Sequence, residues 1–353
     1  MIEPKEQIRC LERVNLDLDN REKYLRLDKN EFVGGMPADI FGGALQKINF
    51  DNITMYPEYK KLKEKIAEIE GLKAENVILG NGSDAIIKNI FETYIDINHD
   101  VLLTDPTFAM YPIYCKMFEA GYVPQVKYKS LDKFPKEEFL KKLEENNAFK
   151  MAVIVNPNNP TGSVVDNRFI LKATEIASQH DVLMVVDEAY HYFHKKTVAN
   201  YVNDFDNLIV LRTFSKFFGL AGLRIGFGVS NQNIITDLRK VQMTYPVDCV
   251  SVAFAREVLD DPKIEYYLYD RFNKGKLYLI NKLNEHNMEY HVGNANFILI
   301  KCNQDVVEKL KDARILIKGG FKQDILKDYI RVTLGDENSM KTFWHHFERY
   351  VND

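Results

Sequence analysis

Two ionisable residues end apolar runs of the sequence, where a reactive group with limited access to water would lie. Lys216 ends LIVLRTFSK (208–216), and Asp187 follows VLMVV (182–186). Desolvation and nearby cations lower the pKa of a lysine and free its amine for Schiff-base chemistry. Burial raises the pKa of a carboxyl group unless a cation, such as a protonated ring nitrogen, faces it. A surface lysine and an N-capping or salt-bridged aspartate are the simpler alternatives.

Groups that suit a phosphate monoester stand close to Lys216 and in a second loop. Ser215 and Arg224 flank a stretch of small residues that lets backbone approach an anion. GNGSDAIIKNIF (80–91) is a glycine-containing loop that enters a helix, whose N-terminus offers free N–H groups and a positive dipole end. Ser83 or Asp84 would serve equally well as an ordinary N-cap. The loop matches neither common nucleotide-binding fingerprint.

A rigid turn, an aromatic residue and two histidines are three further features that bear on the same candidate site. The two prolines of NPNNPTG (156–162) fix a rigid turn, from which Asn159 would direct its amide at a bound group. Phe108, in DPTFAMY, would either stack on a flat heterocycle or pack in the core. His191 and His194 follow Asp187, but no carboxylate spacing completes a metal site, so the sequence predicts no metal.

The elements that would position these residues alternate between strand and helix. Each strand run is apolar at consecutive positions, as in strands buried on both faces of a parallel sheet. Helical periodicity over 86–94, 136–146 and 169–180 separates the runs, which predicts an α/β layered sheet with right-handed crossovers. Because ligands bind beyond the carboxyl ends of such strands, the residues after each run should converge. The runs are VILGNGSD (77–84), VLLTDPT (101–107), MAVIVNPNNPTG (151–162), VLMVVDEAY (182–190) and LIVLRTFSK (208–216).

The pattern changes after about residue 230 and predicts a smaller α+β domain. Helical stretches (232–244 and 250–287) precede strand-like NFILIK, ARILIKGGF and YIRVTLG and a final helix over 338–350. The first 45 residues have few strand signals and should join this part. We therefore expect a large domain at 46–245 and a small domain made of 1–45 and 246–353.

Composition excludes several classes of protein. The 353 residues include 47 basic and 51 acidic side chains, a net charge of −4 that does not favour nucleic acid or anionic lipid as a partner. The first 30 residues lack the apolar core of a signal peptide, and no apolar run approaches the ~20 residues of a membrane helix. The cysteines are scattered, with no C-x-x-C, which fits reduced thiols and a cytoplasmic location.

Three motifs, in this order and spacing, resemble those of fold type I pyridoxal-phosphate aminotransferases. They are Asn-Pro-Asn-Asn-Pro-Thr-Gly (156–162), Asp-Glu-Ala-Tyr (187–190) and Ser-Lys-x-x-x-Leu-Ala-Gly-Leu-Arg (215–224). The resemblance extends over roughly residues 25–350 and is strongest to the histidinol-phosphate aminotransferase-like subgroup. It implies a three-layer fold with a mostly parallel central sheet and a smaller α+β domain, and pyridoxal 5'-phosphate as cofactor. It also implies a homodimer with shared active sites and a role in amino-acid biosynthesis.

The resemblance assigns roles around the cofactor ring. Lys216 would form a Schiff base with the cofactor aldehyde, and Asp187 would pair with the pyridinium nitrogen. Asn159 and Tyr190 would bond the 3-hydroxyl oxygen, and Phe108 would stack on the ring. Lys216, Asp187 and Tyr190 are therefore the expected catalytic residues.

It also assigns a phosphate site, to which the neighbouring subunit would contribute Tyr56 from its MYPEY stretch. Backbone N–H groups of the helix start, two hydroxyls and a guanidinium would hold the phosphate within the subunit. Those groups belong to Ser83, Asp84, Thr213, Ser215 and Arg224.

At the substrate end the sequence departs from the subgroup. Arg331 matches the arginine that binds the substrate's anionic group, but Lys318 stands where a second arginine is usual. Lys29-Asn30-Glu31-Phe32 replaces Asn-Glu-Asn-Pro, and Asn30 is expected to bind substrate. The resemblance thus implies amino transfer between a donor such as glutamate and a small, phosphorylated carbonyl compound. Two alternatives stay open: a decarboxylase of a phosphorylated amino acid, and a non-catalytic protein that retains the fold.

Overall fold

The computed structural model describes residues 2–9, 11, 20–36, 38–48, 50–121, 126–145 and 148–350. The central sheet contains β2 (Val77–Asn81), β3 (Asp100–Leu102), β6 (Phe149–Val155), β7 (Leu183–Asp187), β8 (Leu208–Thr213) and β9 (Ile225–Ser230). The other strands are β1 (Leu25–Arg26), β4 (Thr104–Asp105), β5 (Val126–Lys127), β10 (Tyr290–Val292), β11 (Phe297–Lys301), β12 (Ile315–Leu316) and β13 (Tyr329–Thr333).

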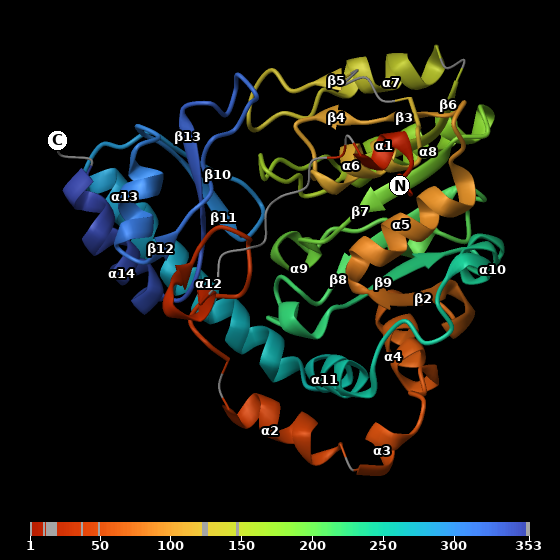
Figure 1. Ribbon diagram of the computed structural model, residues 1–353, viewed down its shortest axis with the longest axis horizontal. Helices are drawn as coiled ribbons and strands as arrows, with labels where there is room; N and C mark the ends of the chain where they lie inside the picture. The colour runs from red at the N-terminus through yellow and green to blue at the C-terminus, as the bar shows by residue number, and fades with distance from the viewer. Residues whose placement is uncertain are drawn as a thin grey trace.

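Helices lie between most of these strands (Figure 1). The first half of the chain has α1 (Glu6–Arg9), α2 (Ala38–Gln46), α3 (Phe50–Thr54), α4 (Lys60–Glu70), α5 (Gly82–Tyr94), α6 (Met110–Met117), α7 (Lys136–Glu144) and α8 (Asn167–Gln179). The second half has α9 (His191–His194), α10 (Gln232–Val241), α11 (Cys249–Asp260), α12 (Pro262–Glu285), α13 (Val306–Asp312) and α14 (Glu337–Phe347). No helix among the described residues combines the length and apolar character needed to cross a bilayer.

The central sheet has the strand order β2-β9-β8-β7-β6-β3, and its predicted strands all run parallel. The prediction of a mostly parallel α/β sheet is confirmed. Strand β9, which is antiparallel to both β2 and β8, was not predicted. Its sequence IGFGVS contains two glycines, which weaken the strand signal. A Cβ on Gly226 would lie 2.4 Å from the Ser83 nitrogen, so glycine is needed for α5 to begin so close to the sheet.

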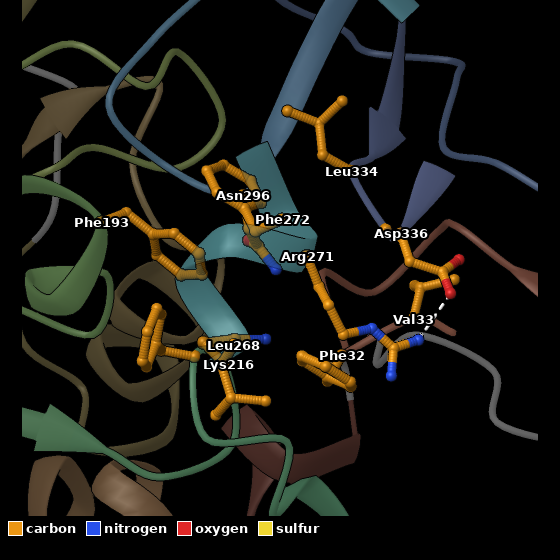
Figure 2. A pocket seen from close by; sticks show the side chains of 12 residues that line it. Phe32, Val33, Phe193, Lys216, Leu268, Arg271, Phe272, Asn296, Leu334 and Asp336 are labelled. Carbon is orange, nitrogen blue, oxygen red and sulfur yellow. Dashed lines mark hydrogen bonds and ion pairs between the residues drawn. The ribbon is translucent and has the colours of Figure 1, made fainter. Parts of the chain in front are cut away.

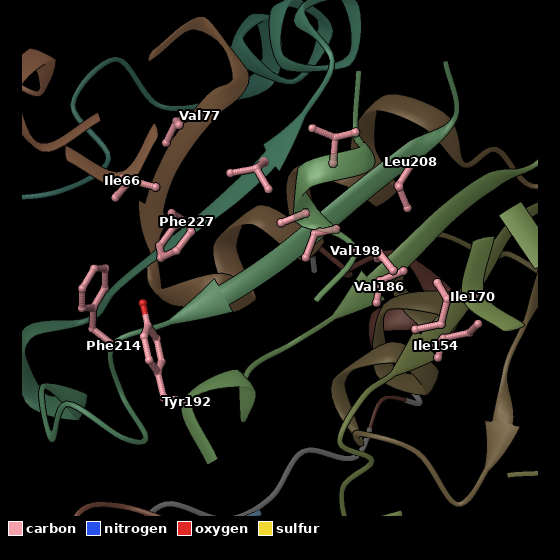
Figure 3. Packing of buried hydrophobic residues seen from close by; sticks show 14 of the residues in the cluster. Ile66, Val77, Ile154, Ile170, Val186, Tyr192, Val198, Leu208, Phe214 and Phe227 are labelled. Atoms are coloured by element: carbon pink, nitrogen blue, oxygen red, sulfur yellow. The ribbon is translucent and has the colours of Figure 1, made fainter. Parts of the chain in front are cut away.

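Alternate residues of each strand enter two hydrophobic clusters, one on each face of the sheet. Ile154, Val186 and Leu208 lie in the cluster that includes α4, α8 and α11 residues (Figure 3). Val153 and Val185, one residue earlier in their strands, pack with α5, α6 and α10. The molecule therefore has a helix–sheet–helix arrangement, the predicted three-layer fold.

The C-terminal part forms an antiparallel sheet β10-β11-β13, next to β12, which pairs with β1. A third cluster lies there, between this sheet and α12 and α14. The expected helix over 250–287 is two helices, because Pro262 starts α12 and the Asp261 carboxylate caps it. Helix α12 contributes Leu268 to the first cluster and Leu279 to the third. The division into domains at 45/46 and 245/246 stays a prediction.

Candidate active site

A cavity of about 120 Å³ lies at the carboxyl ends of β2, β6, β7 and β8. It brings together the residues that were predicted to converge, from loops that are far apart in the sequence. Ten predicted cofactor-binding residues line it: Ser83, Asp84, Phe108, Asn159, Asp187, Tyr190, Thr213, Ser215, Lys216 and Arg224.

Asp187 is the last residue of β7 and is 2% exposed. The Tyr111 hydroxyl donates to Asp187 Oδ2 at 3.0 Å, and the Ala189 N–H donates to Oδ1 at 3.1 Å. Burial raises the pKa of Asp187 to about 6, although these two hydrogen bonds and Lys216 oppose the shift. Asp187 is thus a buried carboxylate whose charge a further cation would stabilise. Tyr111 was missed by the sequence analysis, where its only signal was an aromatic residue close to Phe108.

The Lys216 amine lies in mostly apolar surroundings. Its Nζ donates to the Lys29 carbonyl at 2.9 Å, and Phe193, Leu268 and Phe272 line the adjoining pocket (Figure 2). Burial, followed by the charge of Arg331, lowers the pKa of Lys216 to about 8. A useful fraction of the amine is therefore uncharged near neutral pH, as a nucleophile or general base requires.

One corner of the cavity is built for an anion. The N-terminus of α5, the hydroxyls of Thr213 and Ser215 and the Arg224 guanidinium all lie there. Arg224 Nη1 donates to Ser215 Oγ at 3.4 Å. Gly82 has φ 70°, and a Cβ there would lie 2.7 Å from Arg224 Nη2, so glycine makes room for this guanidinium. A helix N-terminus, two hydroxyls and a guanidinium together fit a phosphate dianion.

The opposite side of the cavity is formed by contacts between the two parts of the chain. Asn159 Oδ1 accepts from Arg331 Nη1 at 2.6 Å, and Arg331 Nη2 donates to the Asp28 carbonyl at 2.8 Å. The guanidinium lies over the Phe297 ring at 5.3 Å, and Arg331 Nε is buried without a partner. Tyr190 is buried, and its hydroxyl accepts from Asn30 Nδ2 at 2.7 Å.

Lys318 is the direct antiparallel neighbour of Arg331. Its N–H donates to the Arg331 carbonyl at 3.1 Å, and the Arg331 N–H donates back at 2.6 Å. Side chains of such a pair lie on one face, so the two cations stand side by side. Partial burial and the charge of Arg331 lower the pKa of Lys318.

Tyr56 does not reach the cavity of its own chain. It is 74% exposed and stacks on Tyr245, with ring centroids 4.0 Å apart. It lines a separate surface groove with Met55 and Arg256.

A buried ionic cluster that begins at Glu188, the residue after Asp187, was also not predicted from the sequence. Glu188 accepts from Arg212 Nε at 3.1 Å, and Arg212 also pairs with Glu70 of α4. This cluster connects the ends of β7 and β8. His191 lies 3.6 Å from Glu188, but nowhere in the described part of the chain do three potential metal ligands gather.

Comparisons with known proteins agree with this geometry. The sequence profile of the family described as "Aminotransferase class I and II" matches residues 22–347. Histidinol-phosphate aminotransferase of Thermoanaerobacter sp. (strain X514) is 34% identical over 318 residues, 88% of each chain. The histidinol-phosphate aminotransferase of Sinorhizobium meliloti, solved in complex with pyridoxal-5'-phosphate, superposes with a TM-score of 0.89 at 20% identity, covering 100% of this chain and 98% of that one. L-threonine-O-3-phosphate decarboxylase of Porphyromonas gingivalis has a TM-score of 0.76 at 19% identity, covering 93% and 100%.

Proposed function

We propose the substrates and the roles of the site residues for this chain, which belongs to the aminotransferase class I and II family and is a pyridoxal-phosphate-dependent aminotransferase. It transfers an amino group between a donor, glutamate, and a small phosphorylated carbonyl compound, in two half reactions. The observation that carries the proposal is the cavity that holds Lys216, Asp187 and the anion corner, with Arg331 bonded to Asn159 of its lining and Lys318 paired with Arg331.

The residues present fit the cofactor. The anion corner at Arg224 and the α5 N-terminus suits its phosphate, and the buried Asp187 carboxylate suits a protonated ring nitrogen. Asn159 and Tyr190 would hold the 3-hydroxyl oxygen, and Phe108 would cover the ring face. When bound, pyridoxal phosphate supplies an electron-accepting ring.

Lys216 is the residue that we propose moves the proton. Its amine has a pKa lowered to about 8 and takes the proton from the substrate carbon that bears nitrogen. The same amine then returns the proton to the carbon on the other side of that nitrogen. Asp187 would keep the ring nitrogen of the bound cofactor protonated, and its buried position limits access of water to that pair. The Lys29 carbonyl accepts a hydrogen bond from the Lys216 amine, and this bond limits the orientation of the Lys216 side chain.

Arg331 and Lys318 are the proposed substrate-binding cations. Arg331 offers a planar fork to a carboxylate or a phosphate, whereas Lys318, which is partly buried but more exposed than Arg331, is a point charge beside it. Histidinol phosphate, which the name of the Thermoanaerobacter relative contains, is one candidate. The wider class is small phosphorylated compounds that exist as a carbonyl and as the corresponding amine.

We expect the two cations to contribute unequally. Arg331→Gln should raise KM for the phosphorylated substrate by about 100-fold, because it leaves a buried anion partner unpaired. Lys318→Gln should raise it by only about fivefold, since an exposed charge pair contributes up to about 1 kcal/mol. Steady-state kinetics with amino donors and with phosphorylated and unphosphorylated acceptors measure both changes in KM. Lys327→Gln is the control, because Lys327 lies in the same connection between β12 and β13 as Lys318. If Lys318→Gln raised KM equally for unphosphorylated acceptors, Lys318 would not be a phosphate-binding residue. Release of carbon dioxide without amino transfer would favour the decarboxylase alternative.

A homodimer with shared active sites is the proposed assembly. Tyr56, Met55 and Met243 are exposed large side chains, and Tyr56 is presented away from its own cavity. In a dimer it would reach the partner's phosphate corner. The proposed location is the cytoplasm, supported by the free Cys115, Cys249 and Cys302 thiols, and the proposed role is amino-acid biosynthesis.

Subunit mixing tests the shared site. Lys216→Ala subunits should be inactive alone and Tyr56→Ala subunits only weakly active, but a hybrid dimer contains one site with both native residues. Random mixing should therefore restore about a quarter of wild-type activity, because half of the dimers are hybrids with one working site of two. If mixing restores nothing although hybrids form, Tyr56 does not act across subunits.

A further inference from the structure

The short segment 28–30, which follows β1, contacts three groups of the active site in succession. Two of the contacts use backbone carbonyls and the third uses a side chain. They join the Asp28 carbonyl to Arg331 Nη2 (2.8 Å), the Lys29 carbonyl to Lys216 Nζ (2.9 Å) and Asn30 Nδ2 to the Tyr190 hydroxyl (2.7 Å).

Asn30 is held in place from several directions. It is 1% exposed and has φ 55°, a left-handed conformation that asparagine tolerates better than most residues. Its N–H donates to Thr333 Oγ1 at 3.1 Å, and its carbonyl accepts from Asn296 Nδ2 at 3.1 Å. Just before it, the Leu27 N–H donates to the Leu316 carbonyl at 2.7 Å, which fixes the segment to β12.

The side-chain amide of Asn30 lies between Tyr190 and Thr333. Asn30 Nδ2 donates to the Tyr190 hydroxyl at 2.7 Å, and Asn30 Oδ1 lies 3.3 Å from Thr333 Oγ1, whose single hydrogen it shares with the Leu27 carbonyl at 2.8 Å. A phenol has one hydrogen to donate and oxygen lone pairs to accept with. Because Asn30 donates to the Tyr190 oxygen, the Tyr190 hydrogen must point elsewhere, and Tyr190 lines the cavity.

We propose that Asn30 is a positioning residue, whose amide turns the Tyr190 hydroxyl hydrogen into the active-site cavity, and not a residue that binds substrate. The inference rests on the proposed function, since it takes the receiving group to be the oxygen of the bound cofactor. Burial raises the pKa of Tyr190 to about 12, so the hydroxyl keeps its hydrogen at neutral pH. Thr333 and Asn296 hold Asn30 in place through hydrogen bonds to its backbone, and they connect the antiparallel part of the fold to the site.

A double-mutant cycle on the holoenzyme tests this role. The readout is the pH midpoint of the absorbance change of the bound cofactor, whose anionic oxygen a donated hydrogen bond stabilises. Asn30→Gly keeps the left-handed backbone but removes the amide, and should raise the midpoint by about half a unit to one unit. Asn30→Asp, which would draw the Tyr190 hydrogen to itself, should raise it further. In the Tyr190→Phe background, Asn30→Gly should have no effect.

Kinetics separate positioning from substrate binding. Asn30→Gly should lower kcat by about tenfold and leave KM nearly unchanged, because a transition-state contact is weakened. Asn287→Gly is the matched control, since Asn287 also has a left-handed φ, 51°, but is exposed in a turn. A rise in KM at constant kcat, or an undiminished midpoint shift in the Tyr190→Phe background, overturns the inference. A wild-type protein that gives no cofactor absorbance overturns the proposed function itself, so the two failures are distinguishable.

Discussion

Replacing Lys216 by alanine is expected to reduce amino transfer by at least about 10⁴-fold, because Lys216 is the one lysine among the described residues that line the cavity, and its amine is the proposed base at the substrate carbon. The nearest cations, Arg331 and Arg224, cannot lose a proton at neutral pH. The measurement is the rate of each half reaction, followed by cofactor absorbance in single-turnover experiments.

Two variants make this result specific. Lys216→Arg retains a positive charge but not a titratable amine, and should be as inactive as Lys216→Ala. Lys240→Ala removes an exposed lysine that pairs with Asp237, and should be as active as the wild type. Residual activity of Lys216→Ala above about 1% of wild type would show that another base serves the reaction.

The second large effect is expected at Asp187. Asp187→Asn should lower kcat/KM by about 10² to 10³-fold, because truncating one partner of a buried charge pair costs about 2–5 kcal/mol. The amide is close in shape to the carboxylate, and the Tyr111 hydroxyl can turn to accept from it, so the fold should persist. Asp181→Asn makes the same chemical change at an exposed position before β7 and should have no effect.

Asp187 should also make cofactor binding depend on pH. Without a cation, burial raises its pKa to about 6, so the carboxyl group is protonated below that pH and charged above it. The same raised pKa means that its contribution to stability is fully present below about pH 4 and is lost as pH rises towards about 6. A cationic ring nitrogen binds the charged form, so cofactor affinity should fall as pH drops below about 6. Titrations that find the same pH dependence in Asp187→Asn would contradict the pairing.

Local pattern was sufficient for the parts of the fold that depend on burial. Strands such as β6 and β7 are apolar at consecutive positions because both faces are covered, and two predicted site residues are found at their ends: Asn159 follows β6, and Asp187 is the last residue of β7. Strand β9 was not predictable in this way, because Gly226 is required by the approach of α5, a contact between distant segments.

The contacts that orient the site side chains could not be read from local pattern. Asn30 and Tyr190 are 160 residues apart, and Asn159 and Arg331 are 172 residues apart. The sequence around each of these residues contains no periodicity or turn pattern from which its partner could be identified. The Tyr111 hydroxyl was likewise indistinguishable from core packing until its hydrogen bond to Asp187 was seen.

We propose that the Lys216 amine is the point of covalent attachment of the cofactor. Reducing the protein with borohydride in the presence of pyridoxal phosphate, followed by peptide mass mapping, locates the attachment directly. We expect one stoichiometric label, on the peptide containing Ser215 and Lys216, and no such label in Lys216→Ala. A label on a different lysine, or no stoichiometric label, would show that Lys216 is not the attachment point.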